Sequence, residues 1–224
     1  MAQPLMGSID LLYAAELTGV AVFAIAGVLS AQGKRLDIFG VVVLAIVTAL
    51  GGGTIRDISL DSYPLVWIAD NNYLWVAVAA AVFSFFFCRY LHYPKRTLLI
   101  LDAMGLALFA TLGAEKAQAA GLAPIIVVMM GVITGAAGGM IRDLLTGQIP
   151  LILQRDGSLY ATCALAGALF YVLADGWLSV TLQLTLSALI VFLLRLAAIF
   201  ANLRLPEFIM AGHEQPKQEQ DKSP

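Results

Sequence analysis

The chain has 224 residues, of which 60% are hydrophobic and only 12% are charged, with a mean hydropathy of +0.87. A soluble domain carries about 25% charged residues, so this composition argues against a soluble globular protein and predicts an integral membrane protein. The net charge of −2 provides no basic field that would attract nucleic acid.

Apolar runs divide the chain into predicted membrane-spanning helices separated by short polar loops. The predicted spans are residues 10–30, 37–61, 73–88, 97–113, 124–145, 159–173 and about 177–203. We expect one all-α transmembrane domain over residues 1–206, with a disordered polar tail over residues 207–224. Aromatic side chains around the loop after the second span are expected to form an interfacial belt. They are Tyr63, Trp67, Tyr73 and Trp75.

Glycine clusters interrupt the second and fifth spans. The second span meets Gly51, Gly52 and Gly53 after about 14 residues, fewer than the roughly 20 that a crossing helix needs. The fifth span meets Gly138 and Gly139 after about a dozen residues. We expect both helices to break there, because non-helical backbone at membrane depth persists only where it faces protein or water. The alternative is that the glycines only let two helices pack closely.

Charged residues at matching positions accompany the two glycine clusters. They are Glu16, Arg56 and Asp57 in the first half, and Asp102, Arg142 and Asp143 in the second. Adjacent helical residues do not face each other, so we expect each arginine and aspartate to pair across the halves or with Glu16 and Asp102. These groups either hold the halves in register or line an aqueous path. Glu16 and Asp102 have a second interpretation, as helix-end acids near the headgroups.

Other polar residues in the spans leave alternatives open. Thr48 and Thr134 lie one turn before the glycines, where their hydroxyls either bond the carbonyl four residues earlier or line the path. Arg195 is expected to extend toward the headgroups from the end of the last span. Cys88 and Cys163 lie in apolar runs and are interpreted as small buried hydrophobes.

An internal repeat relates the two halves. At an offset of 86, residues 19–65 and 105–151 share 18 identities in 47 positions, against about five expected by chance at a match rate of roughly one in ten. Repeat one covers about residues 10–91 and repeat two about residues 97–175. Each holds three spans, and an odd number makes the second copy enter from the opposite side. We therefore predict two inverted three-helix repeats plus a seventh helix.

Basic residues predict the orientation. Most fall on one side of the predicted topology, which places the N-terminus outside and the C-terminus in the cytoplasm. These residues are Lys34, Arg35, Arg89, Lys95, Arg96, Arg155, Arg204, Lys217 and Lys222. The other side has only Arg56 and Lys116, which lie near acids.

The doubled motif resembles the prokaryotic TRIC family of trimeric intracellular cation channels, whose members are also called UPF0126 or glycine transporter family inner-membrane proteins. The motif reads Gly51-Gly52-Gly53-Thr54-Ile55-Arg56-Asp57 with Tyr63-Pro64-Leu65, and Gly138-Gly139-Met140-Ile141-Arg142-Asp143 with Ile149-Pro150-Leu151. The resemblance extends from about residue 11 to residue 206. The second copy has Ala137 where the first has Gly51.

The resemblance implies a homotrimer in the inner membrane with one pore in each protomer, kinked at the glycines of the second and fifth spans. It also implies passive permeation of K⁺ and Na⁺, without a cofactor and with membrane lipid as the other partner. The sequence has no nucleophile–base pair, metal-ligand cluster or ATPase motif, so we expect no enzyme. The alternative function is a secondary transporter for glycine or a similar small zwitterion, because inverted repeats with broken helices also suit alternating access. A structural membrane scaffold is a third class.

Overall fold

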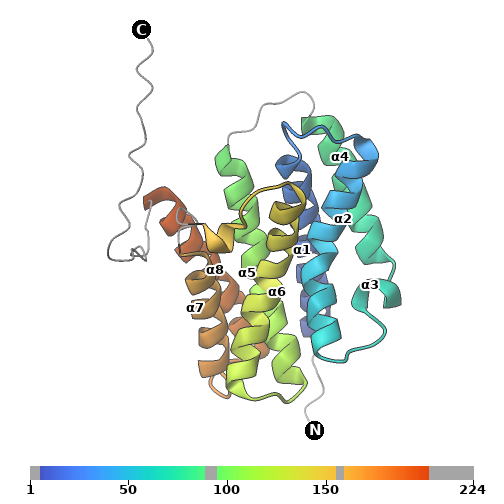
Figure 1. Ribbon diagram of the computed structural model, residues 1–224. Coiled ribbons are helices and arrows are strands. Elements are labelled where there is room, and N and C mark those ends of the chain that lie inside the picture. The colour runs from blue at the N-terminus through green and yellow to red at the C-terminus, as the bar shows by residue number, and fades with distance from the viewer. Residues whose placement is uncertain (1–5, 89–94, 155–158, 202–224) are drawn as a thin grey trace.

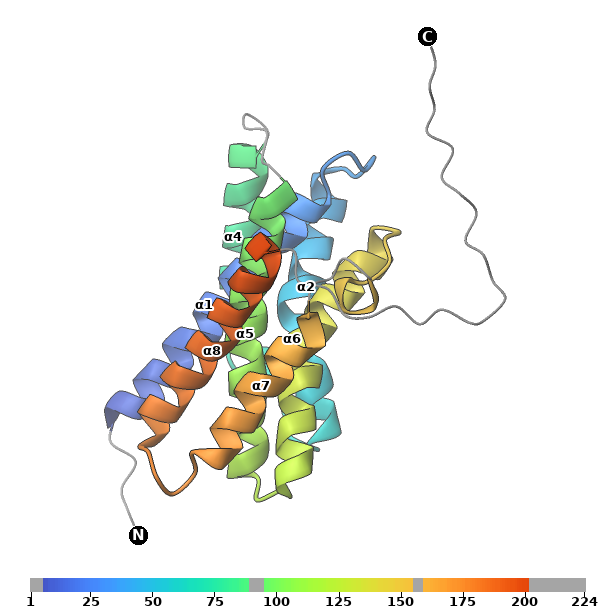
Figure 2. The same cartoon turned by 90° about the vertical axis from the view of Figure 1, so that its left-hand side faces the viewer.

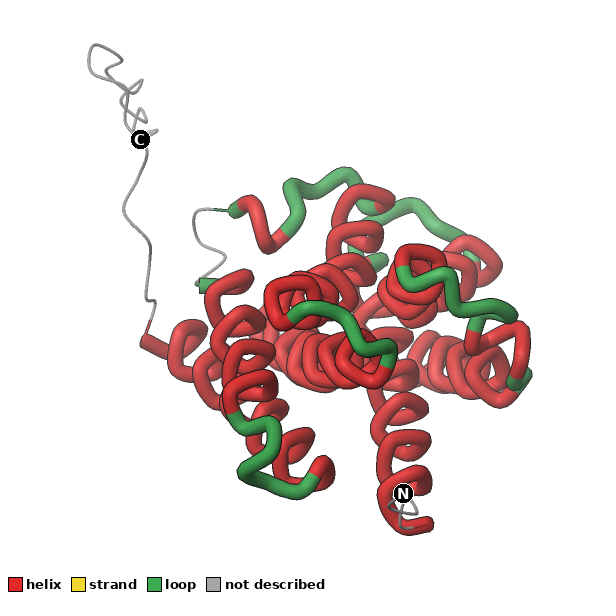
Figure 3. Tube along the Cα trace, turned by 90° about the horizontal axis from the view of Figure 1, so that it is seen from below, coloured by secondary structure: helices red, strands yellow, loops and turns green. Residues whose placement is uncertain are grey.

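The computed structural model describes residues 6–88, 95–154 and 159–201. Over these residues the chain forms a helical bundle joined by loops, and none of them is in a strand (Figure 3). The long helices are α1 (Met6–Ser30), α2 (Ile38–Ser59), α4 (Asn72–Cys88), α5 (Lys95–Ala119), α6 (Pro124–Leu145), α7 (Tyr160–Leu173) and α8 (Val180–Ala201). Two short elements lie in the connections, α3 (Val66–Ala69) and the 3₁₀ helix η1 (Leu151–Leu153).

Membrane-spanning length is clearest for α1, α2, α5, α6 and α8, which are long and apolar enough to cross a bilayer. The helices α4 and α7 are apolar but shorter. The predicted spans correspond to these helices because their end signals are local in sequence. The exception is the end of the fourth span, predicted at residue 113, since α5 continues to Ala119. Asp37 caps α2 by accepting a hydrogen bond from the Gly40 N–H at 2.7 Å. Pro124 begins α6, where its missing N–H has no cost.

The bundle is organised around the contact between α2 and α6, which lie side by side at its centre (Figure 1). Helices α1 and α4 pack against α2, and α5 and α7 pack against α6. Helix α8 packs on α5 and α7, as the turned view shows (Figure 2). In Figure 1, α2 runs downward and α6 runs upward, so their C-terminal ends lie at opposite ends of the bundle. Helices α1 and α5 also run in opposite directions.

The predicted helix breaks are absent, and this prediction is wrong. Helix α2 is continuous through Gly51, Gly52 and Gly53, and α6 is continuous through Gly138 and Gly139. The glycines instead allow close packing. A Cβ on Gly52 would collide with the Thr134 carbonyl oxygen, and a Cβ on Gly138 would collide with the Thr48 carbonyl oxygen. A continuous helix keeps its backbone hydrogen bonds, whose loss in lipid would cost several kcal/mol each.

Reciprocal contacts continue along the junction between the halves. The rings of Phe23 and Phe109, which are 86 residues apart, stack with centroids 5.3 Å apart. Gly105 lies against Phe23, and Gly19 lies against Phe109. In each pair of contacts, the second contact is the first with both residues replaced by their counterparts 86 positions away. This is the property expected of a surface that packs on a copy of itself.

Two of the aromatic residues predicted for an interfacial belt have the exposed side chains that a belt requires, and a third does not. Tyr63 and Trp75 are exposed, whereas Tyr73 is buried. Cys163 is buried and has a free thiol, as predicted. Several predictions lie outside the described residues or their described side chains. They concern the tail 207–224, the Cys88 side chain, and the basic residues Arg89, Lys95, Arg155, Arg204, Lys217 and Lys222.

Candidate functional site

A charge network joins α1 to the C-terminal part of α2. Arg56 donates from Nε to the Asp57 Oδ1 atom at 2.8 Å, and its Nη1 lies 3.4 Å from the Glu16 Oε1 atom. Arg56 and Asp57 are buried, whereas the Glu16 side chain keeps 19% of its surface exposed. We call Glu16, Arg56 and Asp57 the first network.

Three further groups complete the first network. The Tyr73 hydroxyl of α4 donates to the second carboxylate oxygen of Glu16. The Val66 N–H at the start of α3 donates to the Asp57 Oδ2 atom at 3.1 Å. The Lys116 ammonium of α5 lies 2.7 Å from the Asp57 Oδ1 atom. The first network therefore ties both repeats together at one end of the bundle.

A surface carboxylate extends this network toward solvent. The Asn72 N–H donates to the Asp70 Oδ1 atom at 2.9 Å, and the Tyr13 hydroxyl donates to its Oδ2 atom at 2.7 Å. These hydrogen bonds hold the pKa of the exposed Asp70 carboxyl below its usual range. The Tyr13 ring meets the Tyr73 ring edge-on with centroids 5.9 Å apart, so two tyrosines connect Asp70 to Glu16.

A second network repeats this arrangement near the C-terminal end of α6. Arg142 donates from Nη1 to the Asp102 Oδ1 atom at 2.8 Å, and its Nη2 lies 2.8 Å from the Asp143 Oδ1 atom. The Leu151 N–H at the start of η1 donates to the Asp143 Oδ2 atom at 2.9 Å, as Val66 does for Asp57. We call Asp102, Arg142 and Asp143 the second network. All three residues are buried, so this network is better shielded from solvent than the first.

The predicted pairing of the arginines with Glu16 and Asp102 is confirmed. One detail was predicted wrongly, and one alternative interpretation is excluded. Each arginine also binds the aspartate next to it, because the long guanidinium arm folds back so that its nitrogens reach that carboxylate. Asp102 lies inside α5 and is buried, so it is not a headgroup acid.

Tyr160 and Arg195 extend the second network toward α8. Tyr160 is buried, and the Cζ atom of Arg195 lies 4.7 Å from the centre of its ring, a cation–π distance. Arg195 is 1% exposed. The prediction that its side chain extends to the headgroups is therefore wrong, because the aromatic ring holds the guanidinium inside the bundle.

The two glycines of each matched pair face different neighbours. Gly52 and Gly138 face the opposite helix, as described above. In contrast, the Cβ direction of Gly53 points to the Arg56 guanidinium at 3.8 Å, and that of Gly139 points to the Asp102 carboxylate at 3.0 Å. The first glycine of each pair thus sets the helix spacing, and the second leaves room for the charges.

Thr48 and Thr134 are buried where α2 meets α6. Their hydroxyls donate to the carbonyls of Leu44 and Met130 within their own helices, each at 2.6 Å. Of the two alternatives for these threonines, the structure has the intrahelical bond. Both threonine side chains have an exposed fraction of 0%.

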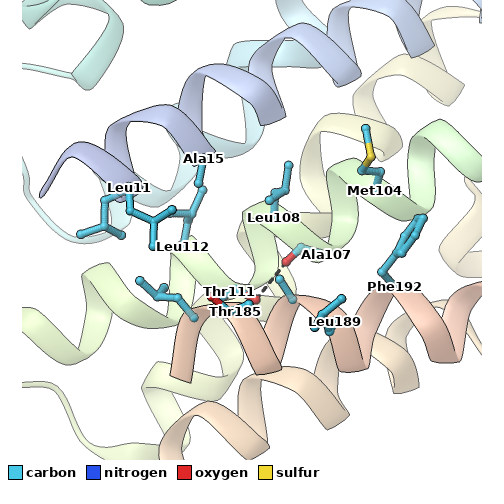
Figure 4. Close-up of a pocket in the computed structure, with 13 residues that line it drawn as sticks. Leu11, Ala15, Met104, Ala107, Leu108, Thr111, Leu112, Thr185, Leu189 and Phe192 are labelled. Carbon is cyan, nitrogen blue, oxygen red and sulfur yellow. Dashed lines mark hydrogen bonds between the residues drawn. The ribbon is translucent and has the colours of Figure 1, made fainter. Parts of the chain in front are cut away.

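The bundle has a small cavity with charged residues in its lining and a larger groove with an apolar lining. A cavity of about 20 Å³, roughly enough for one water molecule, is lined by Glu16, Gly53, Arg56, Asp57 and Tyr73 among others. A larger groove of about 290 Å³ lies between α1 and α8 over α5 (Figure 4). Its lining is aliphatic and aromatic except for Thr111 and Thr185, and it contains no charged residue. The groove therefore has no charged side chain to stabilise an ion.

Sequence reasoning missed Tyr73, Tyr160 and Lys116 as network residues. The tyrosines are 87 residues apart, one more than the repeat offset, so an ungapped alignment does not match them. Lys116 was noted only as a basic residue near acids. Its contact with Asp57 crosses from one half to the other, and no local pattern indicates it.

The apolar helices and their buried charges define a multi-pass membrane protein. A family model for glycine transporters matches the chain twice, over residues 13–89 and 99–175. The chain belongs to this family. It is 44% identical to the UPF0126 inner membrane protein YadS of Escherichia coli (strain K12), over 89% of this chain and 97% of that one. It is 35% identical to the UPF0126 membrane protein YvgT of Bacillus subtilis (strain 168), over 85% and 93%.

Solved structures with the same fold are TRIC channels. The chain resembles the TRIC trimeric intracellular cation channel orthologue from Rhodobacter sphaeroides with a TM-score of 0.82 and 40% identity, over 86% of this chain and 99% of that one. It resembles a prokaryotic TRIC channel crystallised in 0.5 M KCl with a TM-score of 0.82 and 39% identity, over 88% and 100%. These matches confirm the resemblance that the doubled motif indicated.

Proposed function

We propose that the protein is a passive channel for monovalent cations, K⁺ and Na⁺, with one path in each protomer. The path runs along the α2–α6 contact and connects the two networks. The observation that carries this proposal is the pair of buried networks at opposite ends of that contact, in a chain with the TRIC fold. Ionisable groups inside membrane-spanning helices usually face a path for ions or substrate.

Charge balance supports cations over anions. Each network has two carboxylates against one arginine, so each arginine is more than neutralised by its immediate neighbours. The three residues of each network therefore carry a formal net charge of −1, which Lys116, 2.7 Å from Asp57, and Arg195, over the Tyr160 ring, bring to zero when they are in place. Charge of one sign in a low-dielectric wall concentrates ions of the other sign.

The reciprocal contacts support an inverted-repeat architecture of seven membrane helices. Gly52 and Gly138 exchange partners across the α2–α6 contact, and Phe23 stacks on its own counterpart Phe109. The opposite directions of α1 and α5 fit a two-fold axis in the membrane plane. In this proposal α8 stands outside the repeat.

The described conformation is closed at the α2–α6 contact. The Thr48 and Thr134 side chains are buried there, and the backbones touch at the glycines. Opening requires α2 and α6 to separate or bend at these positions. Glycine permits this because it adds no side chain to the contact and restrains the backbone least.

We further propose a homotrimer in the inner membrane, with the N-terminus outside and the C-terminus in the cytoplasm. Inner-membrane location is supported by the name of the E. coli relative, and the trimer by the name of the Rhodobacter orthologue. The basic loops support the orientation. Exposed apolar side chains on α4 and α8 provide surface for lipid or for neighbouring protomers.

Glycine transport is the alternative that the family description raises. A transporter with broken helices would bind the carboxylate of glycine at the half-helix N-termini next to the breaks. Because α2 and α6 are continuous, those N-termini are absent at the glycines. Proteoliposomes test the two functions together. A channel releases K⁺ down its gradient without saturation and takes up no glycine, whereas saturable glycine uptake without K⁺ flux would overturn the proposal.

A further inference from the structure

Lys116 is an addition to the first network that the repeat does not predict. Its ammonium lies 2.7 Å from the Asp57 Oδ1 atom, which also accepts the Arg56 Nε–H at 2.8 Å. The other oxygen of Asp57 accepts the Val66 N–H. Asp57 therefore has two cationic partners and one backbone donor.

The second network shows that an aspartate in this place does not need the ammonium. Asp143 is held by Arg142 and by the Leu151 N–H, the same kinds of partner that Arg56 and Val66 supply to Asp57. The position that corresponds to Lys116 in the first repeat is Ser30, 86 residues earlier. The Ser30 hydroxyl donates to the Gly27 carbonyl within its own helix at 2.7 Å. Lys116 thus breaks the reciprocity found along the rest of the junction.

Exposure also separates Lys116 from the other cations. The Lys116 side chain is 26% exposed, whereas those of Arg56 and Arg142 are buried. A lysine is a compact charge on a flexible stem with rotatable bonds. Its ammonium can leave Asp57 for solvent without moving a helix, which the enclosed guanidinium groups cannot do. A cavity with room for about one water molecule adjoins Asp57, Arg56 and Glu16.

We propose that the Lys116 ammonium is a tethered competitor for permeant cations at Asp57. With the ammonium in place, the negative charge of Asp57 is neutralised and cation entry at this end of the path is weakened. When K⁺ displaces the ammonium, the carboxylate becomes available to the permeant ion. This inference rests on the proposed channel function, and it makes the two ends of the path electrically unequal.

The test records K⁺ conductance of wild-type protein, Lys116→Gln and Lys116→Arg at about 0.01 M and about 1 M KCl, where screening is weak and strong respectively. Lys116→Gln should raise conductance at the low concentration by about threefold to fivefold, the equilibrium factor of a partly exposed ion pair. The gain should shrink at the high concentration, and Lys116→Arg, which keeps the positive charge, should not show the gain. Lys34→Gln, which removes an equal charge from the exposed loop after α1, serves as the matched control.

The outcomes separate this inference from the channel proposal. A silent wild-type protein would contradict the channel itself. A conducting wild type with unchanged or reduced conductance in Lys116→Gln would overturn the inference and leave Lys116 as a structural clamp.

A second measurement uses wild-type protein alone and applies even if Lys116→Gln fails to fold. Limiting acetic anhydride labels accessible amines, and mass spectrometry compares Lys116 with the exposed Lys34. Replacing tetraethylammonium, which has no N–H to consume the reagent, with K⁺ at constant ionic strength should raise labelling of Lys116 and not of Lys34. Equal labelling of Lys116 in both salts would overturn the competition.

Discussion

Replacing Gly52 with alanine tests the close approach of α2 and α6. The added Cβ would overlap the Thr134 carbonyl oxygen, and the next nearest atom is the Gly138 nitrogen at 3.5 Å. Both are backbone atoms of α6, so the clash cannot be relieved by rotating a side chain. Overpacking of this kind costs about 1–3 kcal/mol.

Gly53→Ala is the matched control in the same helix. Apart from the backbone of its own helix, the nearest neighbour of its Cβ would be the Arg56 guanidinium at 3.8 Å, an ordinary contact. Both variants gain about 0.5–1 kcal/mol from alanine's greater helix propensity, so the difference between them isolates the overpacking term. At about 2–4 °C per kcal/mol for a chain of this size, Gly52→Ala should melt about 2–12 °C below Gly53→Ala.

Thermal unfolding of the detergent-solubilised protein, followed by tryptophan fluorescence, measures this difference. Gly53→Ala should melt at or slightly above the wild-type temperature. If the two variants melt together, the backbone contact at Gly52 is wrong. If Gly53→Ala is the less stable variant, the assignment of the two glycines to different neighbours is wrong.

The networks and the threonine provide three further predictions, each measured by the same melting assay with K⁺ flux alongside. Asp143→Asn should cost about 3–5 kcal/mol, because it leaves a buried guanidinium undercompensated. Asp57→Asn should cost less, because two groups of its network, Glu16 and Lys116, are partly exposed. Wild-type stability and flux in both variants would refute the networks. Tyr73→Phe should cost about 1.5–3 kcal/mol by removing a hydrogen bond to the Glu16 carboxylate, and an unchanged melt would show that bond to be unimportant. Thr48→Val should change stability by less than about 1.5 kcal/mol, since only an intrahelical bond is lost; a large fall in flux at unchanged stability would instead place its hydroxyl on the path.

The membrane spans and the pairing of Arg56 with Glu16 and of Arg142 with Asp102 could be predicted from the sequence, because their signals are local or repeated. Asp37 and Pro124 mark helix starts by chemistry that depends only on neighbouring residues. The equivalence of Glu16 and Asp102 near two Arg-Asp pairs indicated which acids the arginines bind.

The role of the glycines could not be predicted in the same way. A helix break and a close helix contact both require glycine, and the two differ only in what lies opposite. At Gly52 that is a carbonyl oxygen of Thr134, on a helix more than 70 residues further along the chain. Sequence periodicity carries no information on such a contact, and the same applies to Lys116 on Asp57.

The most direct test of the proposed channel is planar-bilayer recording of the purified protein in asymmetric KCl. The account predicts discrete current steps whose reversal potential follows the K⁺ gradient, with Gly52→Ala altering the steps more than Gly53→Ala. A silent bilayer, with the protein shown to be inserted and folded, would contradict the channel. A reversal potential that followed the Cl⁻ gradient would contradict the net negative charge assigned to the two networks.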